Sequence, residues 1–288
     1  MDRRAALRLG ATLLGGSLLP RRFAFAGDTK RWFCIGACDW SIGQAGRTEA
    51  MAVAREIGLD GVQVSLGSEA DDMKLRRREV QSAYLQAARA AGVGFTGLAI
   101  GELNNIPYKS DPRTEQWVSD SIDVAQVLGC RSILLAFFEK GDLKEDLPGR
   151  REVIRRLRKV APKAEKANVY LGIESWLSAE EHLDMIQAVG SSHVKVYYDV
   201  ANSHRMGYDI YKEIRKLGTY ICEFHMKENG FLLGKGAVDF KAVRAAIDDI
   251  GYNGCMQIEG AIPPGASMIE SYRANYRFLR SIFPERKA

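Results

Sequence analysis

The chain is poor in the residues on which several common kinds of site depend. Its 288 residues include only four histidines and five cysteines. Three residues separate Cys34 from Cys38, but no second Cys or Cys/His pair follows at zinc-site spacing, which excludes the usual small zinc modules. We expect the thiols to act as small buried apolar side chains, and a Cys34–Cys38 disulfide stays open.

Two further absences concern membranes and nucleotides. No run reaches the roughly 18 to 20 uncharged apolar residues of a membrane-spanning helix. The turn after the first strand-like run, CDWSIGQAG at residues 38–46, lacks the spacing Gly-x-Gly-x-x-Gly. Because dinucleotide-binding folds place that glycine-rich turn there, we do not expect a dinucleotide site.

The excess of positive charge lies at the N-terminus. Residues 1–26 hold five of the 41 Lys and Arg and one of the 36 Asp and Glu, so residues 27–288 keep 36 and 35 and a net charge near +1 instead of +5. A nearly neutral domain lacks the electrostatic footprint of a nucleic-acid-binding protein. The basic segment at 149–167 is interpreted as a solvated outer helix.

Residues 1–26 have the order of an export signal. Arg3-Arg4 precede an apolar run from Leu9 to Leu19, and Ala24-Phe25-Ala26 resembles a cleavage site. The paired arginines resemble a twin-arginine signal, although Ala6 stands where such signals often have Phe. An ordinary amphipathic helix is the alternative. We predict a periplasmic protein exported by the twin-arginine route, with its catalytic domain in residues 27–288 and no stable membrane association after cleavage.

The remainder alternates eight times between strand-like and helix-like patterns. Strands are predicted at 32–40, 61–66, 94–103, 132–138, 170–175, 194–202, 221–228 and 255–260. Helices are predicted at 48–57, 78–91, 115–128, 149–167, 179–189, 211–217, 240–250 and 267–282. Most of these helices are followed by Gly or Asn, which accept the left-handed conformation of a helix end. The pattern predicts an α/β fold, a single (β/α)8 TIM barrel.

Each of the last four strand patterns carries one metal-binding side chain near its end. They are Glu174, Asp199, His225 and Glu259. Because the C-terminal ends of barrel strands surround one mouth, these side chains are expected to meet. Three carboxylates and one imidazole suit Mn2+ best, with Mg2+, Co2+ and Zn2+ as alternatives.

The motifs around these residues resemble a known family. The chain resembles the xylose-isomerase-like barrel superfamily, in particular its sugar (phosphate) isomerase/epimerase branch, in the motifs LGIES, VYYDVANS, EFHMKEN and MQIEG. The segment LGKG at 233–236, between the last two motifs, belongs to the same resemblance. That branch includes ketose 3-epimerases, hydroxypyruvate isomerases and inosose dehydratases. The resemblance implies that the four side chains bind the metal. It also implies that Glu174 and Glu259 are acid and base in a sugar or keto-sugar isomerisation or epimerisation through a cis-enediolate.

Six further residues are candidates for substrate binding: Trp40, Glu102, Glu180, Asn202, His204 and Lys227. Asn202 stands where several ketose epimerases carry His, and Phe231 where they carry Arg, which argues against free-ketose 3-epimerisation. Glu180 has a plainer explanation as first-turn charge beside the capping box Ser178–Glu181. His204 also has a plainer explanation, as a solvent-exposed loop residue.

Other functions stay as alternatives. A lyase or dehydratase acting on a keto-sugar, inosose or oxidised glycoside would use the same metal and base. A DNA-repair endonuclease of the related barrel family uses a three-zinc cluster with many histidines, whereas this chain has four in total. A sugar-binding protein without catalysis is disfavoured because both candidate bases are present. The expected partner is a small carbohydrate and not a nucleic acid, and a homo-oligomer is left open.

Overall fold

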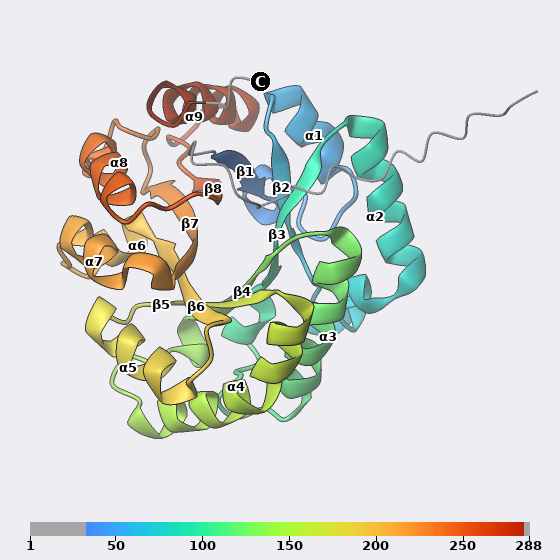
Figure 1. Cartoon of the computed structure of the whole chain (residues 1–288). Coiled ribbons are helices and arrows are strands. Elements are labelled where there is room, and N and C mark those ends of the chain that lie inside the picture. The colour runs from blue at the N-terminus through green and yellow to red at the C-terminus, as the bar shows by residue number, and fades with distance from the viewer. Residues whose placement is uncertain (1–32, 285–288) are drawn as a thin grey trace, which may run out of the picture.

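The structure, a computed structural model, describes residues 33–284. Its eight parallel strands close into one barrel in chain order, as Figure 1 shows. They are β1 (Cys34–Cys38), β2 (Gly61–Ser65), β3 (Gly94–Ile100), β4 (Ser132–Phe137), β5 (Tyr170–Ser175), β6 (Val194–Asp199), β7 (Ile221–Glu228) and β8 (Cys255–Gly260). β8 pairs with β1 from Cys255↔Cys34 onward, which completes the barrel. The predicted (β/α)8 fold is confirmed.

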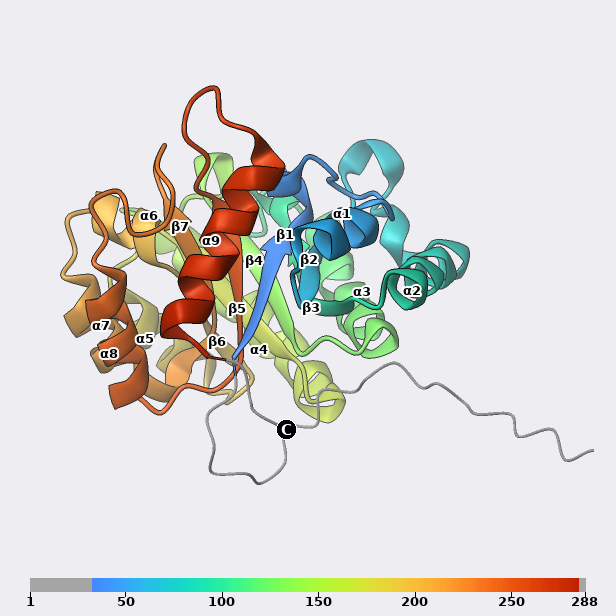
Figure 2. The ribbon, with the colours of Figure 1, turned by 90° about the horizontal axis from the view of Figure 1, so that it is seen from above.

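Helices cover the outside of the barrel on all sides (Figures 1 and 2). They are α1 (Ala50–Ile57), α2 (Arg78–Ala91), α3 (Arg113–Leu128), α4 (Leu147–Ala167), α5 (Ala179–Val189), α6 (Val200–Arg205), α7 (Ile210–Leu217), α8 (Phe240–Asp249) and α9 (Met268–Ile282). Between helices and strands lies a fully buried aliphatic layer that includes Ile35, Val64, Leu98, Ile133 and Ile173. Burial of this layer is the main stabilisation of the fold.

Three predicted strands end earlier than their apolar runs, and each early end positions a polar side chain. The run 194–202 leaves the sheet at Asp199, whose Oδ1 accepts hydrogen bonds from the backbone N–H groups of Ala201 and Asn202 and so begins α6. The runs 32–40 and 94–103 turn into short 3-10 segments, Asp39–Ile42 and Gly101–Asn104. The strand prediction was wrong at these ends because local capping and turns override the apolar pattern.

All five cysteines are free thiols. Cys34 and Cys38 lie at opposite ends of β1, about 13 Å apart at roughly 3.3 Å per residue, which is too far for a disulfide. The predicted export signal of residues 1–26 lies outside the described residues. Between residues 33 and 284 no helix is both long enough and apolar enough to span a membrane.

Candidate metal centre and substrate pocket

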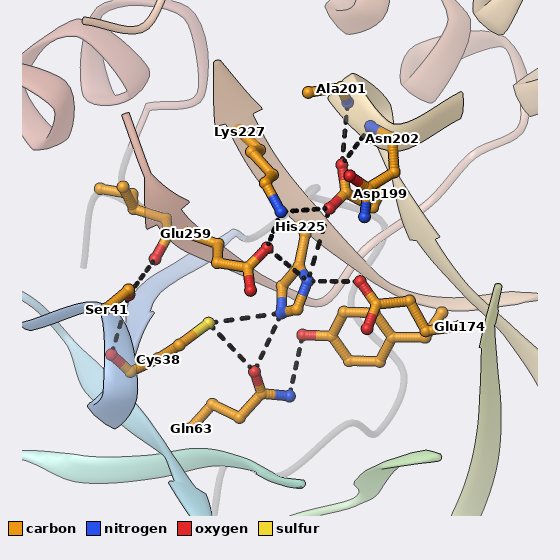
Figure 3. Close-up of polar contacts among 12 residues, drawn as sticks. Cys38, Ser41, Gln63, Glu174, Asp199, Ala201, Asn202, His225, Lys227 and Glu259 are labelled. Atoms are coloured by element: carbon orange, nitrogen blue, oxygen red, sulfur yellow. Dashed lines mark hydrogen bonds and ion pairs between the residues drawn. The ribbon is translucent and has the colours of Figure 1, made fainter. Parts of the chain in front are cut away.

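Glu174, Asp199, His225 and Glu259 meet at the C-terminal mouth of the barrel. One ligand atom from each lies within 4.8 Å of all the others. His225 Nδ1 lies 2.8 Å from Glu174 Oε1, 3.5 Å from Glu259 Oε2 and 3.9 Å from Asp199 Oδ2 (Figure 3). The imidazole is therefore at the centre of three carboxylates that come from three other strands.

Strand register explains this convergence. Asp199 of β6 is paired with His225 of β7, and two residues further along β7 Lys227 is paired with Glu259 of β8. Because side chains alternate along a strand, His225 and Lys227 face the same side. Glu174 on β5 lies beside Ala136 of β4, whose small side chain leaves room for the carboxylate.

The ionisable side chains of the cluster shift one another's pKa values. Burial raises the pKa of Asp199 to about 6, with Glu259 and Glu174 adding to the shift and Lys227 opposing it. Burial alone would raise the pKa of Glu259 too, but His225 and Lys227 outweigh it and hold that pKa near 2. Burial would lower the pKa of His225, yet Cys38, Glu174 and Glu259 raise it well above the usual value.

The donor set fits a divalent cation. Asp199 Oδ2 is buried and has no hydrogen-bond partner among the described residues, although Lys227 Nζ lies 3.4 Å away. Within residues 33–284, the ion pairs of the three clustered carboxylates are with Lys227 and His225. Oxygen ligands with one imidazole nitrogen match manganese, magnesium or cobalt. The four side chains would hold such an ion.

A cavity of about 620 Å³ opens directly above the cluster. Glu174, Lys227 and Glu259 line its floor, and aromatic side chains line its walls: Trp40, Phe138 and Trp176. Trp40 Nε1 donates a hydrogen bond to Glu259 Oε1 at 2.9 Å, and the rings of Phe138 and Trp176 lie 5.2 Å apart. A cavity of this size, with apolar walls and a few polar groups, is typical of small-molecule binding sites.

Four of the six predicted substrate contacts line this cavity: Trp40, Glu102, Asn202 and Lys227. Glu180 does not. It is exposed on α5 and forms an ion pair with Lys216, while Ser178 and Glu181 form the expected capping box. His204 is exposed on α6 and is not a lining residue, whereas its neighbour Arg205 is. Successive residues of a helix point about 100° apart, so the helix phase decides which side chain reaches the cavity.

Several residues around the site were missed by the sequence analysis. Phe138 and Trp176 line the cavity, and Gln63 and Cys38 lie within hydrogen-bonding distance of His225. Gln63 was recognisable in one respect, since it is a polar residue between Val62 and Val64 in the middle of a strand. A buried polar side chain needs a partner, but the sequence does not show which one.

The fold and the cluster define a class of protein: TIM barrels whose ligands bind at the C-terminal ends of the strands. The chain belongs to the xylose isomerase-like TIM barrel family, which matches residues 51–282. It is similar to the D-psicose 3-epimerase of Enterocloster bolteae, with 29% identity over 128 residues that cover 41% of this chain and 42% of that protein. It is also 25% identical over 176 residues to the 2-epi-5-epi-valiolone 7-phosphate 2-epimerase of an Actinoplanes species, covering 61% and 64%. Both matches span less than two thirds of the relative.

Solved structures show the same fold. The D-psicose 3-epimerase of Clostridium cellulolyticum H10, determined with D-tagatose, superposes with a TM-score of 0.72 at 19% identity over 87% of this chain and 99% of that one. The 3-keto-D-glucoside 4-epimerase of E. coli superposes with a TM-score of 0.70 at 15% identity over 86% and 99%. At these identities the likeness concerns the fold alone.

Proposed function

We propose that the protein is a divalent-metal-dependent isomerase or epimerase of a sugar or keto-sugar. The observation that carries the proposal is the meeting of Glu174, Asp199, His225 and Glu259 at one point below a cavity of about 620 Å³. Relatives named as epimerases, one of them acting on the ketose D-psicose, support it. Manganese is the ion we propose, because the donor set is mostly oxygen with one imidazole.

The chain supplies two carboxylates for proton transfer. When bound, a divalent ion would supply positive charge next to the substrate oxygens on which negative charge develops. Glu259 is held by Trp40 at one oxygen and by Lys227 at the other, which fixes its position on the cavity floor. Glu174 has one oxygen on His225 and lines the same cavity. Either carboxylate would take the proton from the carbon next to a carbonyl, and the other would return one.

The place where the proton returns decides the product. Return to the same carbon from the opposite face inverts that carbon, which is an epimerisation. Return to the neighbouring carbon converts an aldose into a ketose or the reverse. Epimerisation needs one carboxylate on each face of the substrate, whereas isomerisation needs only one carboxylate, on the face where the proton leaves and returns. The same pair of glutamates serves either outcome.

We propose an uncharged sugar as substrate. Beyond the cluster and Lys227, which is paired with Glu259, the lining formed by the described residues includes the carboxylates of Asp71, Glu102 and Glu139 and one guanidinium, that of Arg205. Carboxylates accept hydrogen bonds from hydroxyl groups and repel a phosphate. The aromatic walls suit the apolar faces of a sugar ring. An uncharged substrate also agrees with the proposed export to the periplasm.

A lyase acting on an oxidised glycoside is the second candidate. A cavity of about 620 Å³ has room for about 20 waters at roughly 30 Å³ each, which is more than one hexose fills. A glycoside with a second group would use that space. The same base would take the proton, and a β-oxygen would leave.

The test is proton exchange in deuterated water. The Mn2+-loaded protein is incubated with uncharged ketoses, keto-glycosides and matched sugar phosphates, and the products are followed by NMR and mass spectrometry. Deuterium on carbon with an isomer or epimer supports the proposal, while elimination products support the lyase. Glu259→Gln should abolish exchange and Glu180→Gln, outside the cavity, should not. Tight metal binding with no exchange on any substrate would overturn the enzyme assignment.

A further inference from the structure

A buried chain of hydrogen bonds runs down the barrel interior from the metal cluster. His225 Nε2 lies 3.0 Å from Gln63 Oε1, and Gln63 Nε2 lies 3.1 Å from the hydroxyl of Tyr197. That hydroxyl lies 3.1 Å from Glu223 Oε1. All four side chains are at most 2% exposed. Figure 3 shows Gln63 beneath His225, on the side opposite Glu174.

The donors and acceptors allow the chain one direction, because Glu223 Oε1 also accepts a hydrogen bond from Gln257 Nε2 at 2.6 Å and is therefore an acceptor. Tyr197 has a single proton, which it donates to Glu223, so its oxygen accepts from Gln63 Nε2. The amide of Gln63 therefore turns Oε1 towards His225. Cys38 Sγ, 3.2 Å away, donates to the same Oε1, which favours the same orientation.

An amide oxygen at this place needs a proton on the imidazole nitrogen that faces it. A neutral imidazole carries one proton, so a proton on Nε2 leaves the lone pair on Nδ1. Nδ1 is the nitrogen 2.8 Å from Glu174 Oε1, in the middle of the carboxylates. The reversed amide would favour the other tautomer and place a proton where the cation would bind.

We propose that Gln63 is a positioning residue that selects the His225 tautomer able to bind a metal through Nδ1, and that Tyr197 and Glu223 set the direction of its amide. The inference rests on the proposed metal centre. Partners of metal-binding histidines typically change metal affinity by 10- to 100-fold when they are mutated.

Two substitutions of similar size separate this role from simple packing. Gln63→Met removes the acceptor and should weaken Mn2+ binding by about 10- to 100-fold. Gln63→Glu keeps an oxygen acceptor for the His225 Nε2 proton, and its affinity for Mn2+ should stay within several-fold of the wild-type value. Tyr197→Phe leaves the Gln63 amide free to turn, and its affinity for Mn2+ should lie between the affinities of Gln63→Met and Gln63→Glu. Affinities are measured by calorimetry on the full chain, and thermal unfolding without metal identifies any variant that fails to fold.

A spectroscopic measurement reads the tautomer directly. In the Mg2+- or Zn2+-loaded wild type, long-range proton–nitrogen NMR should show the His225 proton on Nε2. Equal affinities for wild type and Gln63→Met, equal losses for Gln63→Met and Gln63→Glu, or a proton on Nδ1 would each overturn the inference. A wild-type protein that binds no divalent ion would instead overturn the metal centre and the proposed function with it.

Discussion

Lys227 Nζ lies 2.7 Å from Glu259 Oε2, at positions that face each other on β7 and β8. Trp40 occupies the other oxygen of the same carboxylate. Glu259 is therefore held at both ends, and Lys227 together with His225 keeps its pKa near 2 although burial alone would raise it. The position and the charge of this candidate base depend on the same neighbouring lysine.

Lys227→Met should remove both effects. Without the ammonium group the pKa of Glu259 rises, so the acidic limb of the kcat/KM profile moves to higher pH, and kcat/KM at neutral pH falls by about 100-fold. Lys227→Arg keeps the charge and should retain more activity. A pH-rate profile of the three proteins measures this, and an unchanged acidic limb in Lys227→Met would contradict the role of Lys227.

Metal binding should release protons and strengthen with pH. The pKa of His225 is raised well above its usual value, so the metal-free protein carries a proton there at pH 7, and Asp199 with a pKa of about 6 gains one on acidification. A cation competes with these protons, so affinity for Mn2+ should fall by roughly tenfold per pH unit near pH 7, and more steeply below about pH 6, where Asp199 adds a second competing proton. Calorimetry in buffers with different heats of ionisation counts the released protons. A pH-independent affinity would argue against these ligands.

The two predicted glutamate contacts should differ in their effect on substrate binding. Glu102 lines the cavity, whereas Glu180 is paired with Lys216 on the outside. Glu102→Gln replaces an acceptor that faces the substrate and should raise KM by about 5- to 50-fold, the equivalent of roughly 1 to 2 kcal/mol. Glu180→Gln should leave KM unchanged. Steady-state kinetics with the substrate found in the exchange assay measures both KM values. Equal changes of KM in the two variants would contradict the placement of Glu102 inside the cavity and Glu180 outside it.

His182 should make the fold sensitive to mild acid. It is 3% exposed, its ring nitrogens contact Ser175 Oγ at 2.9 Å and the Ser178 carbonyl at 3.0 Å, and burial lowers its pKa to about 4. The unfolded chain binds a proton below pH 6.5 whereas the folded one does not until about pH 4. The free energy of unfolding should therefore fall by about 3 kcal/mol over this range.

His182→Gln removes this titration and provides the comparison. Denaturant unfolding of both proteins between pH 7 and pH 4 gives the difference in their free energies of unfolding. That difference should shrink as the pH falls, because only the wild type loses stability to this group. Two parallel curves would show that His182 does not titrate as described.

Much of the candidate site was predictable because of how parallel strands form a barrel. A residue at the C-terminal end of such a strand lies at the mouth whatever its neighbours are, so Glu174, Asp199, His225 and Glu259 had to come to the same level. The C-terminal ends of the predicted helices followed, to within one residue, from apolar periodicity and from the Gly or Asn after most of them, but α6 was not predicted. The ends of β1, β3 and β6 did not follow from the apolar pattern, because Asp199 and the turns after the other two strands stop the sheet before the apolar residues run out.

The sequence by itself determined the barrel and the four metal-binding side chains at its mouth, because strand and helix periods and strand ends are local properties of the chain. Only the tertiary structure decided that Gln63 meets His225, 162 residues away, and that Arg205 rather than His204 reaches the cavity. Those choices depend on strand register around a closed barrel and on the rotation of a short helix. Both are set by packing among distant segments, which no local pattern records.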